Sequence, residues 1–187
     1  YGHFETELHL RHSGHRLFIR NLCDEGNTPG FRPHSARPSP WAFPGAEKYY
    51  PKRSKAKDKW GSGHTGYGKH ETPDQWLGRM RPDVMIAFFG FNESFDGVKG
   101  LENFKAELED FLKHIRSQKY NGMAAPQVAL VSPIAFEDLS ATHGTPDGTV
   151  TNANLALYTA AMEDVAAKHQ VWFVNLFSLT QGWYEST

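Results

Sequence analysis

The chain has 187 residues, of which 39% are hydrophobic and 13% aromatic, a composition typical of a folded globular domain with a sizeable core. Its formal net charge of -1 gives no overall attraction to nucleic acid or to acidic membranes, and no apolar run is long enough to span a membrane. The single cysteine, Cys23, excludes an internal disulfide framework.

The first part of the chain predicts one helix, one strand and a long loop. Apolar residues at helical spacing predict a short helix over residues 3–12. The β-prone run Leu17–Leu22 predicts a strand, and the turn residues that follow place Gly26 at its carboxyl end. Residues from about 28 to 70 are rich in proline and glycine without periodicity, which indicates a long irregular insertion, either a functional lid or a disordered segment.

The strongest strand signal lies in the middle of the chain. A cap pattern with proline at the first helical position predicts a helix over Thr72–Met80, which leads into it. Six consecutive apolar residues, Val84–Phe89, then predict a central parallel strand buried on both faces. Asn92 and Glu93 follow this strand, and in open α/β sheets ligands bind outside the carboxyl ends of the strands.

The second half of the chain alternates helices and strands. Apolar residues at intervals of three and four predict an amphipathic helix over residues 100–120, with its charged residues on the other face. Residues 128–131 and 171–174 predict two more strands, and the helix between them is expected to begin at Thr151 or Asn152. This alternation predicts an α/β fold, a three-layer α/β/α sandwich with a flavodoxin-like parallel sheet.

Several familiar binding motifs are present only in part. Gly61–Gly66 matches a dinucleotide fingerprint and Gly63–Lys69 matches P-loop spacing, but neither follows a predicted strand, so a flexible glycine-rich loop is the simpler interpretation. The basic residues within 48–59 alternate with aromatic ones, yet a solvated loop explains them better than nucleic-acid binding. The ten histidines form no metal-binding motif, and we expect neither a metal nor another cofactor.

Two strand ends carry the functional hypothesis. If the strands before Gly26 and Asn92 flank the switch point of the sheet, both residues face one crevice. A glycine backbone N–H and an asparagine amide are donors that can stabilise the oxyanion of an acyl-transfer reaction. Either residue alone is better explained as a turn glycine or a strand-end cap, so the hypothesis depends on their occurring together.

The segments Asn21–Gly26, Gly90–Glu93 and Ser132–Pro133, in this order, resemble the middle of an SGNH (GDSL-type) hydrolase. The resemblance implies that Gly26 and Asn92 are the oxyanion-hole residues, with Glu93 where aspartate is commoner in the family. It also implies no cofactor.

Two family blocks do not occur in the sequence: the Gly-Asp-Ser block of the nucleophile and the late Asp-x-x-His block. We expect both to lie outside residues 1–187, so that the chain is a single, incomplete domain truncated at both ends and poorly stable alone. The resemblance is strongest to SGNH domains of large exported bacterial proteins. It implies an extracytoplasmic location, periplasmic or secreted, and fusion to further domains.

The resemblance implies hydrolysis of a carboxylic ester by a Ser-His-Asp mechanism in the intact protein. A carbohydrate O-acyl ester is the expected substrate class, with Trp41, Phe43 and Trp60 as sugar-stacking candidates and Glu93 as a further substrate contact. Two alternatives remain open. One is a non-catalytic, ligand- or carbohydrate-binding derivative of the fold, and the other is a flavodoxin-like nucleotide-binding module that uses the loop at residues 61–68.

Overall fold

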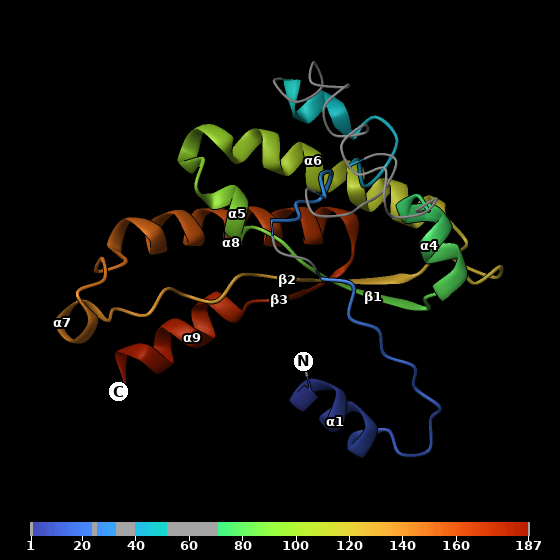
Figure 1. Ribbon diagram of the computed structural model, residues 1–187, viewed down its shortest axis with the longest axis horizontal. Coiled ribbons are helices and arrows are strands. Elements are labelled where there is room, and N and C mark those ends of the chain that lie inside the picture. The colour runs from blue at the N-terminus through green and yellow to red at the C-terminus, as the bar shows by residue number, and fades with distance from the viewer. Residues whose placement is uncertain (1, 24–25, 33–39, 52–70, 187) are drawn as a thin grey trace, which may run out of the picture.

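The computed structural model of the chain describes residues 2–23, 26–32, 40–51 and 71–186 (Figure 1). In chain order the elements are α1 (Gly2–Arg11), η1 (Ala46–Tyr49), α4 (Pro73–Met80), β1 (Val84–Phe88), α5 (Phe91–Ser94), α6 (Gly97–Ser117), β2 (Gln127–Val131), α7 (Ser140–His143), α8 (Thr149–His169), β3 (Trp172–Val174) and α9 (Leu176–Glu185). None of the described helices combines the length and the apolar character needed to cross a lipid bilayer.

The three strands form one parallel sheet in the order β1-β2-β3. Phe88 at the end of β1 pairs with Val131, which in turn pairs with Val174 of β3. The strands therefore end at the same edge of the sheet, which is the edge where ligands bind in folds of this class. The predicted parallel α/β arrangement is confirmed.

The prediction that the run Val84–Phe89 is a central strand, buried on both faces, is wrong. β1 lies at the edge of the sheet, and its residues Val84, Ile86 and Phe88 are 51%, 39% and 53% exposed. β2 is the central strand instead, with four consecutive buried residues, Val128–Val131. An apolar run indicates that a strand favours burial, but it does not specify which strand or helix will cover it.

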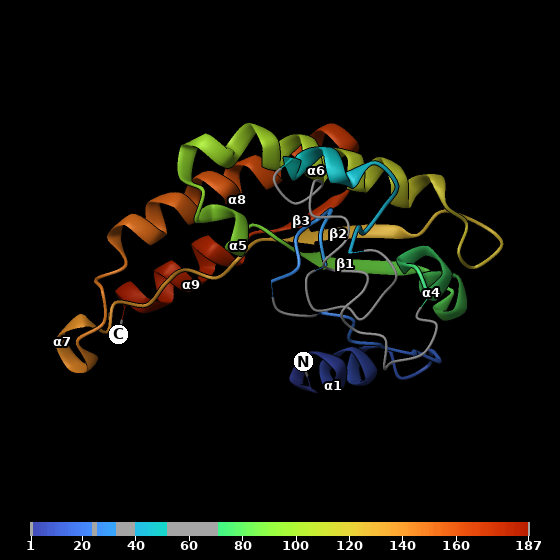
Figure 2. The ribbon, with the colours of Figure 1, turned by 45° about the horizontal axis from the view of Figure 1, so that its top comes forward.

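Helices α6 and α8 cover one face of the sheet (Figures 1 and 2). The core between them and the sheet contains fully buried residues from all three elements: Leu108, Leu112, Leu130, Tyr158 and Met162. On the opposite side, α1 lies beneath the sheet in both views and buries no residue. The described residues thus form two packed layers, and the three-layer sandwich is not confirmed.

The predicted strand at Leu17–Leu22 has no regular secondary structure. Phe18 is 75% exposed, and none of the strands in the described part of the chain pairs with this segment. A β-prone sequence becomes a strand only when a neighbouring strand accepts its backbone hydrogen bonds.

The described parts of the predicted insertion, residues 28–32 and 40–51, are packed against α6. Phe31, Ala42, Phe43 and Ala46 are buried there, and Phe31 forms an isolated antiparallel bridge with Trp41. This part of the insertion is therefore neither disordered nor a detached lid. The two glycine-rich motifs between Gly61 and Lys69, and most of the basic run, lie outside the described residues.

Two helix boundaries also differ from expectation. α8 begins at Thr149 with Gly148 as its N-cap, whereas Asn152, an expected cap, binds the backbone of Phe136 through both its amide oxygen and its amide nitrogen. Residues Leu176–Glu185, for which the sequence pattern predicted no helix, form α9. The start of α8 was misplaced because its N-cap is a glycine without a capping side chain, whereas α9 has a side-chain cap, Asn175, whose amide oxygen accepts from the N–H of Ser178.

We expect Leu108→Ala to lower the free energy of unfolding by about 2–5 kcal/mol, because it removes a fully buried side chain between α6 and α8 and leaves a cavity. Urea denaturation followed by circular dichroism measures this change. Leu157→Ala is the matched control, since Leu157 is 39% exposed on α8. Equal losses in the two variants would contradict the described core.

Candidate functional site

The turn after β1 is the first component of the site. Gly90 has a φ of 97° and serves as the N-cap of α5, and its N–H donates to the Glu93 carboxylate (2.9 Å). A Cβ at Gly90 would lie 3.1 Å from Met162 Sδ and 3.3 Å from Pro133 Cδ. Both the backbone conformation and the close approach of the segment after β2 therefore require glycine here.

The structure brings the two predicted oxyanion-hole residues into one region. Asn92, exposed in the first turn of α5, donates from Nδ2 to the backbone carbonyl of Asn27, next to Gly26 (3.3 Å). Gly26 itself has a φ of 74°, in the left-handed region that favours glycine. An amide nitrogen carries two N–H groups, so the bond to Asn27 orients the Asn92 amide and leaves its second N–H to donate to a ligand.

Glu93 lies inside the protein, in contrast to its exposed neighbour Asn92. Its side chain is 8% exposed, and Oε1 has no hydrogen-bond partner among the described residues. Burial raises the pKa of Glu93 to about 8, and the nearby carboxylates of Glu107 and Asp96 also raise it, against backbone hydrogen bonds that lower it. This position supports a role in holding the β1–α5 turn, and a substrate contact by Glu93 stays a prediction.

The sequence pattern did not predict that Glu107 is buried. The prediction that the charged residues of this helix lie on its outer face is wrong for Glu107, which is buried beside Leu108 on the core side of α6. Its burial could have been predicted from its position: Glu107 comes three residues after Phe104 and four before Phe111, within the apolar stripe of the helix. Its partners come from the insertion, which no helical pattern identifies.

The three sugar-stacking candidates occupy different environments. Trp41 is partly buried in a cluster with Phe31 and Tyr50, with ring centroids 5.6 Å and 5.8 Å away. Phe43 is buried and stacked on His114, so the suggestion that it binds a sugar is wrong, because its ring is covered by the core. Trp60 lies outside the described residues.

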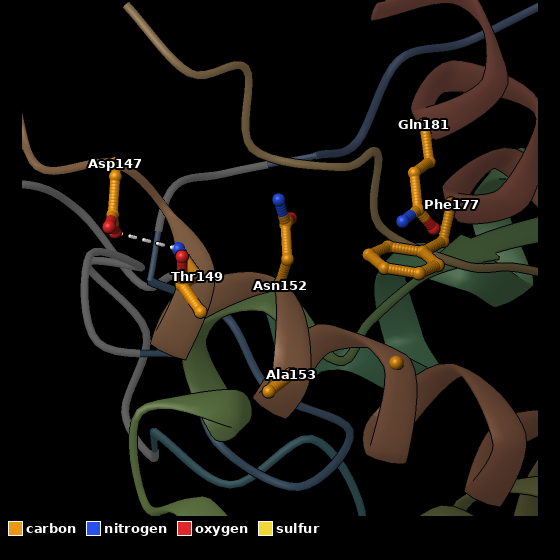
Figure 3. A pocket seen from close by; sticks show the side chains of 7 residues that line it. Asp147, Thr149, Asn152, Ala153, Phe177 and Gln181 are labelled. Carbon is orange, nitrogen blue, oxygen red and sulfur yellow. Dashed lines mark hydrogen bonds between the residues drawn. The ribbon is translucent and has the colours of Figure 1, made fainter. Parts of the chain in front are cut away.

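A cavity of about 390 Å³ lies between the start of α8 and α9 (Figure 3). Its lining residues are Asp147, Thr149, Asn152, Ala153, Ala156, Phe177 and Gln181. It is built from the segments that follow β2 and β3, and so belongs to the same edge of the sheet as Gly90. None of the predicted site residues lines it, and its carboxylate at Asp147 accepts a hydrogen bond from the N–H of Thr149 (3.0 Å).

The nucleophile and base of a hydrolase are not found in the described ranges. No serine hydroxyl there hydrogen-bonds to a histidine ring: Ser117 donates to the backbone carbonyl of His114, and Ser132 is buried, donating to the carbonyl of Pro133 and accepting from the N–H of Phe177. Nor do the described residues contain a group of three or more histidine, cysteine, aspartate or glutamate residues that could hold a metal ion.

Comparison with known proteins gives one match. A family model described as the GDSL-like lipase/acylhydrolase family matches residues 30–186, a range that includes Asn92, Glu93 and Glu107 and begins just after Gly26. No curated protein and no solved structure matches the chain significantly.

The raised pKa of Glu93 predicts a pH-dependent stability. The stabilising effect of the neutral carboxyl group is fully present below its ordinary pKa of 4.5 and is lost as the pH rises towards about 8. We expect wild-type protein to lose stability relative to Glu93→Gln across this range, by up to about 1.4 kcal/mol per pH unit. Urea denaturation at pH 5, 6.5 and 8 measures the difference.

Glutamine keeps an oxygen that can accept from the Gly90 N–H, so the variant tests ionisation and not loss of the turn. Glu102→Gln, at an exposed position of α6, is the control and should show no such trend. A constant difference between wild-type protein and Glu93→Gln at all three pH values would refute the prediction.

Proposed function

The chain belongs to the GDSL-like lipase/acylhydrolase family, and on this premise we propose that it hydrolyses carboxylic esters with Gly26 and Asn92 as its oxyanion hole. The observation that carries the proposal is the hydrogen bond from Asn92 Nδ2 to the carbonyl of Asn27, since it brings the two donors, far apart in sequence, to one place. The site lies at the edge of the sheet where the strands end.

The proposed reaction is acyl transfer through a serine ester. A serine hydroxyl attacks the ester carbonyl, a histidine takes the serine proton and returns it to the leaving alcohol, and water then releases the acid. The carbonyl oxygen becomes negatively charged in each tetrahedral intermediate. The backbone N–H of Gly26 and the second N–H of Asn92 would stabilise this charge, and the bond to Asn27 orients the Asn92 amide before the substrate binds.

The serine, histidine and aspartate of this mechanism are expected outside residues 1–187, so activity is tested in the full-length protein. We propose a carbohydrate O-acyl ester as the substrate class and an extracytoplasmic location, both of which stay predictions. Trp41 is the described candidate for this substrate class, since its ring is only partly buried and an aromatic face can stack on a sugar.

Asn92→Ala should lower kcat for a short-chain aryl acetate about 10²–10³-fold, because it removes one donor to the oxyanion. Steady-state kinetics measure this loss. Asn103→Ala, at an exposed position of α6, is the control and should retain wild-type kcat. A full-length protein that is folded but inert with wild-type Asn92 would favour the non-catalytic, ligand-binding alternative.

Trp41→Ala should raise KM about tenfold for an acetylated oligosaccharide and leave KM for the aryl acetate unchanged, because only the sugar ester loses a stacking surface worth about 1.4 kcal/mol. The matched control is Trp76→Ala, since Trp76 is also partly buried but lies on α4, before β1. Equal changes for both substrates would argue against a sugar-binding role for Trp41.

A further inference from the structure

Glu107 is a carboxylate in the interior of the protein, 1% exposed in the middle of α6. Its Oε1 atom accepts three hydrogen bonds: from the backbone N–H of Gly30 (2.5 Å), the hydroxyl of Tyr50 (2.7 Å) and the hydroxyl of Thr28 (2.8 Å). A buried carboxylate is unfavourable unless donors compensate for its lost hydration. The three donors offset part of this cost, and burial still raises the pKa of Glu107 above its ordinary value.

All three donors belong to the same stretch of chain, far from Glu107 in the sequence. Thr28, Gly30 and Tyr50 precede it by 79, 77 and 57 residues. The hydroxyl oxygens of Thr28 and Tyr50 also lie next to each other, and, because each hydroxyl carries one hydrogen, two hydrogens serve this contact and the two contacts to Glu107. One side chain of α6 therefore fixes both ends of the described insertion.

The insertion approaches Glu107 so closely at Gly30 that a side chain at this position would clash. A Cβ at Gly30 would lie 2.9 Å from Glu107 Oε1 and 3.1 Å from Ala46 Cβ. The turn is also closed on itself, because the N–H of Thr28 donates to the carbonyl of Phe31 (2.8 Å) and the N–H of Phe31 donates to the hydroxyl of Thr28 (3.1 Å). Residues 28–31 thus form a compact turn held on the Glu107 carboxylate.

This turn continues directly into the candidate site. Asn27, the residue before Thr28, provides the carbonyl that orients the Asn92 amide, and Gly26 precedes it. Asn92 itself lies on α5, which precedes α6 in the chain and contacts it. The carboxylate and the Asn92 amide therefore hold neighbouring residues of the same segment.

We propose that Glu107 is a positioning residue of the oxyanion hole: its buried carboxylate, bound to Thr28, Gly30 and Tyr50, fixes the Asn27 carbonyl that orients the Asn92 amide. This inference rests on the proposed function. Glu107 does not contact the substrate, and it acts only through the turn. Misplacing a catalytic group by about 1 Å can lower the rate about 10²-fold, so a distant anchor can be important for catalysis.

The test uses the full-length protein and Glu107→Met, which keeps the length of the side chain but removes the acceptor. We expect kcat for the aryl acetate to fall about 10- to 100-fold with KM within about twofold of wild type. Glu107→Gln keeps one oxygen that can accept and should restore most of kcat. Glu102→Met, at an exposed position of the same helix, is the control and should leave kcat unchanged.

A double-mutant cycle with Asn92→Ala separates positioning from general destabilisation. If Glu107 acts through the Asn92 amide, Glu107→Met should lower kcat less in the Asn92→Ala background than in the wild-type background. An equal loss in both backgrounds, or wild-type kcat in a folded Glu107→Met protein, overturns the inference. Unchanged kcat in Asn92→Ala alone instead overturns the proposed function.

If Glu107→Met does not fold, two smaller changes carry the same test. Tyr50→Phe removes one donor and keeps the ring that packs on Phe31 and Trp41, while Thr28→Val removes another donor and Thr28→Ser keeps it. We expect Tyr50→Phe and Thr28→Val each to lower kcat severalfold at temperatures well below their Tm, and Thr28→Ser to match wild type. Wild-type kcat in both donor-removing variants overturns the inference.

Discussion

The parallel pairing of β1 with β2 is the constraint on which the candidate site depends. Its register sets Phe88 opposite Val131, so the turns that follow the two strands meet at one edge. Pro133 lies close to Gly90 there, so a side chain at residue 90 would be crowded as well as strained by the positive φ. The chain therefore turns sharply into α5, and this short helix presents Asn92 to solvent while it turns Glu93 inward.

Local sequence patterns predicted most of the helices and strands because each pattern depends on residues close together in the chain. The capping box of Thr72 and Gln75 and the apolar stripe of α6 are both of this kind. The strands that pair with a given strand, and the helices that cover it, cannot be predicted in this way, since they depend on which distant segments come together. The run Leu17–Leu22 and the exposed face of β1 show this: both are apolar, and neither contains information about the element that would pair with it or cover it.

The proximity of Gly26 and Asn92 was predicted from the sequence, although on a topological ground that holds only for Asn92. Two residues at the ends of parallel strands were expected to meet, and Gly26 and Asn92 do lie in one region although Leu17–Leu22 forms no strand. The buried carboxyls of Glu93 and Glu107 could not be predicted in the same way. Glutamate is usually exposed, and each is held inside by backbone or hydroxyl donors that the sequence does not identify, in the case of Gly30 from 77 residues away.

The attachment of the insertion to α6 also affects how the structure unfolds locally. The insertion is held by its polar anchor, which joins segments 57 to 79 residues apart, and by Ala42, Phe43 and Ala46, which belong to the apolar core of the sheet and its two covering helices. Such a segment can detach as a separate cooperative unit, at a lower free energy than global unfolding. Amide exchange at Gly30 would then be faster than in β2. Mutations in this unit could abolish turnover in a chain whose thermal denaturation looks normal, so selection for activity and selection for stability would act on different parts of the same domain.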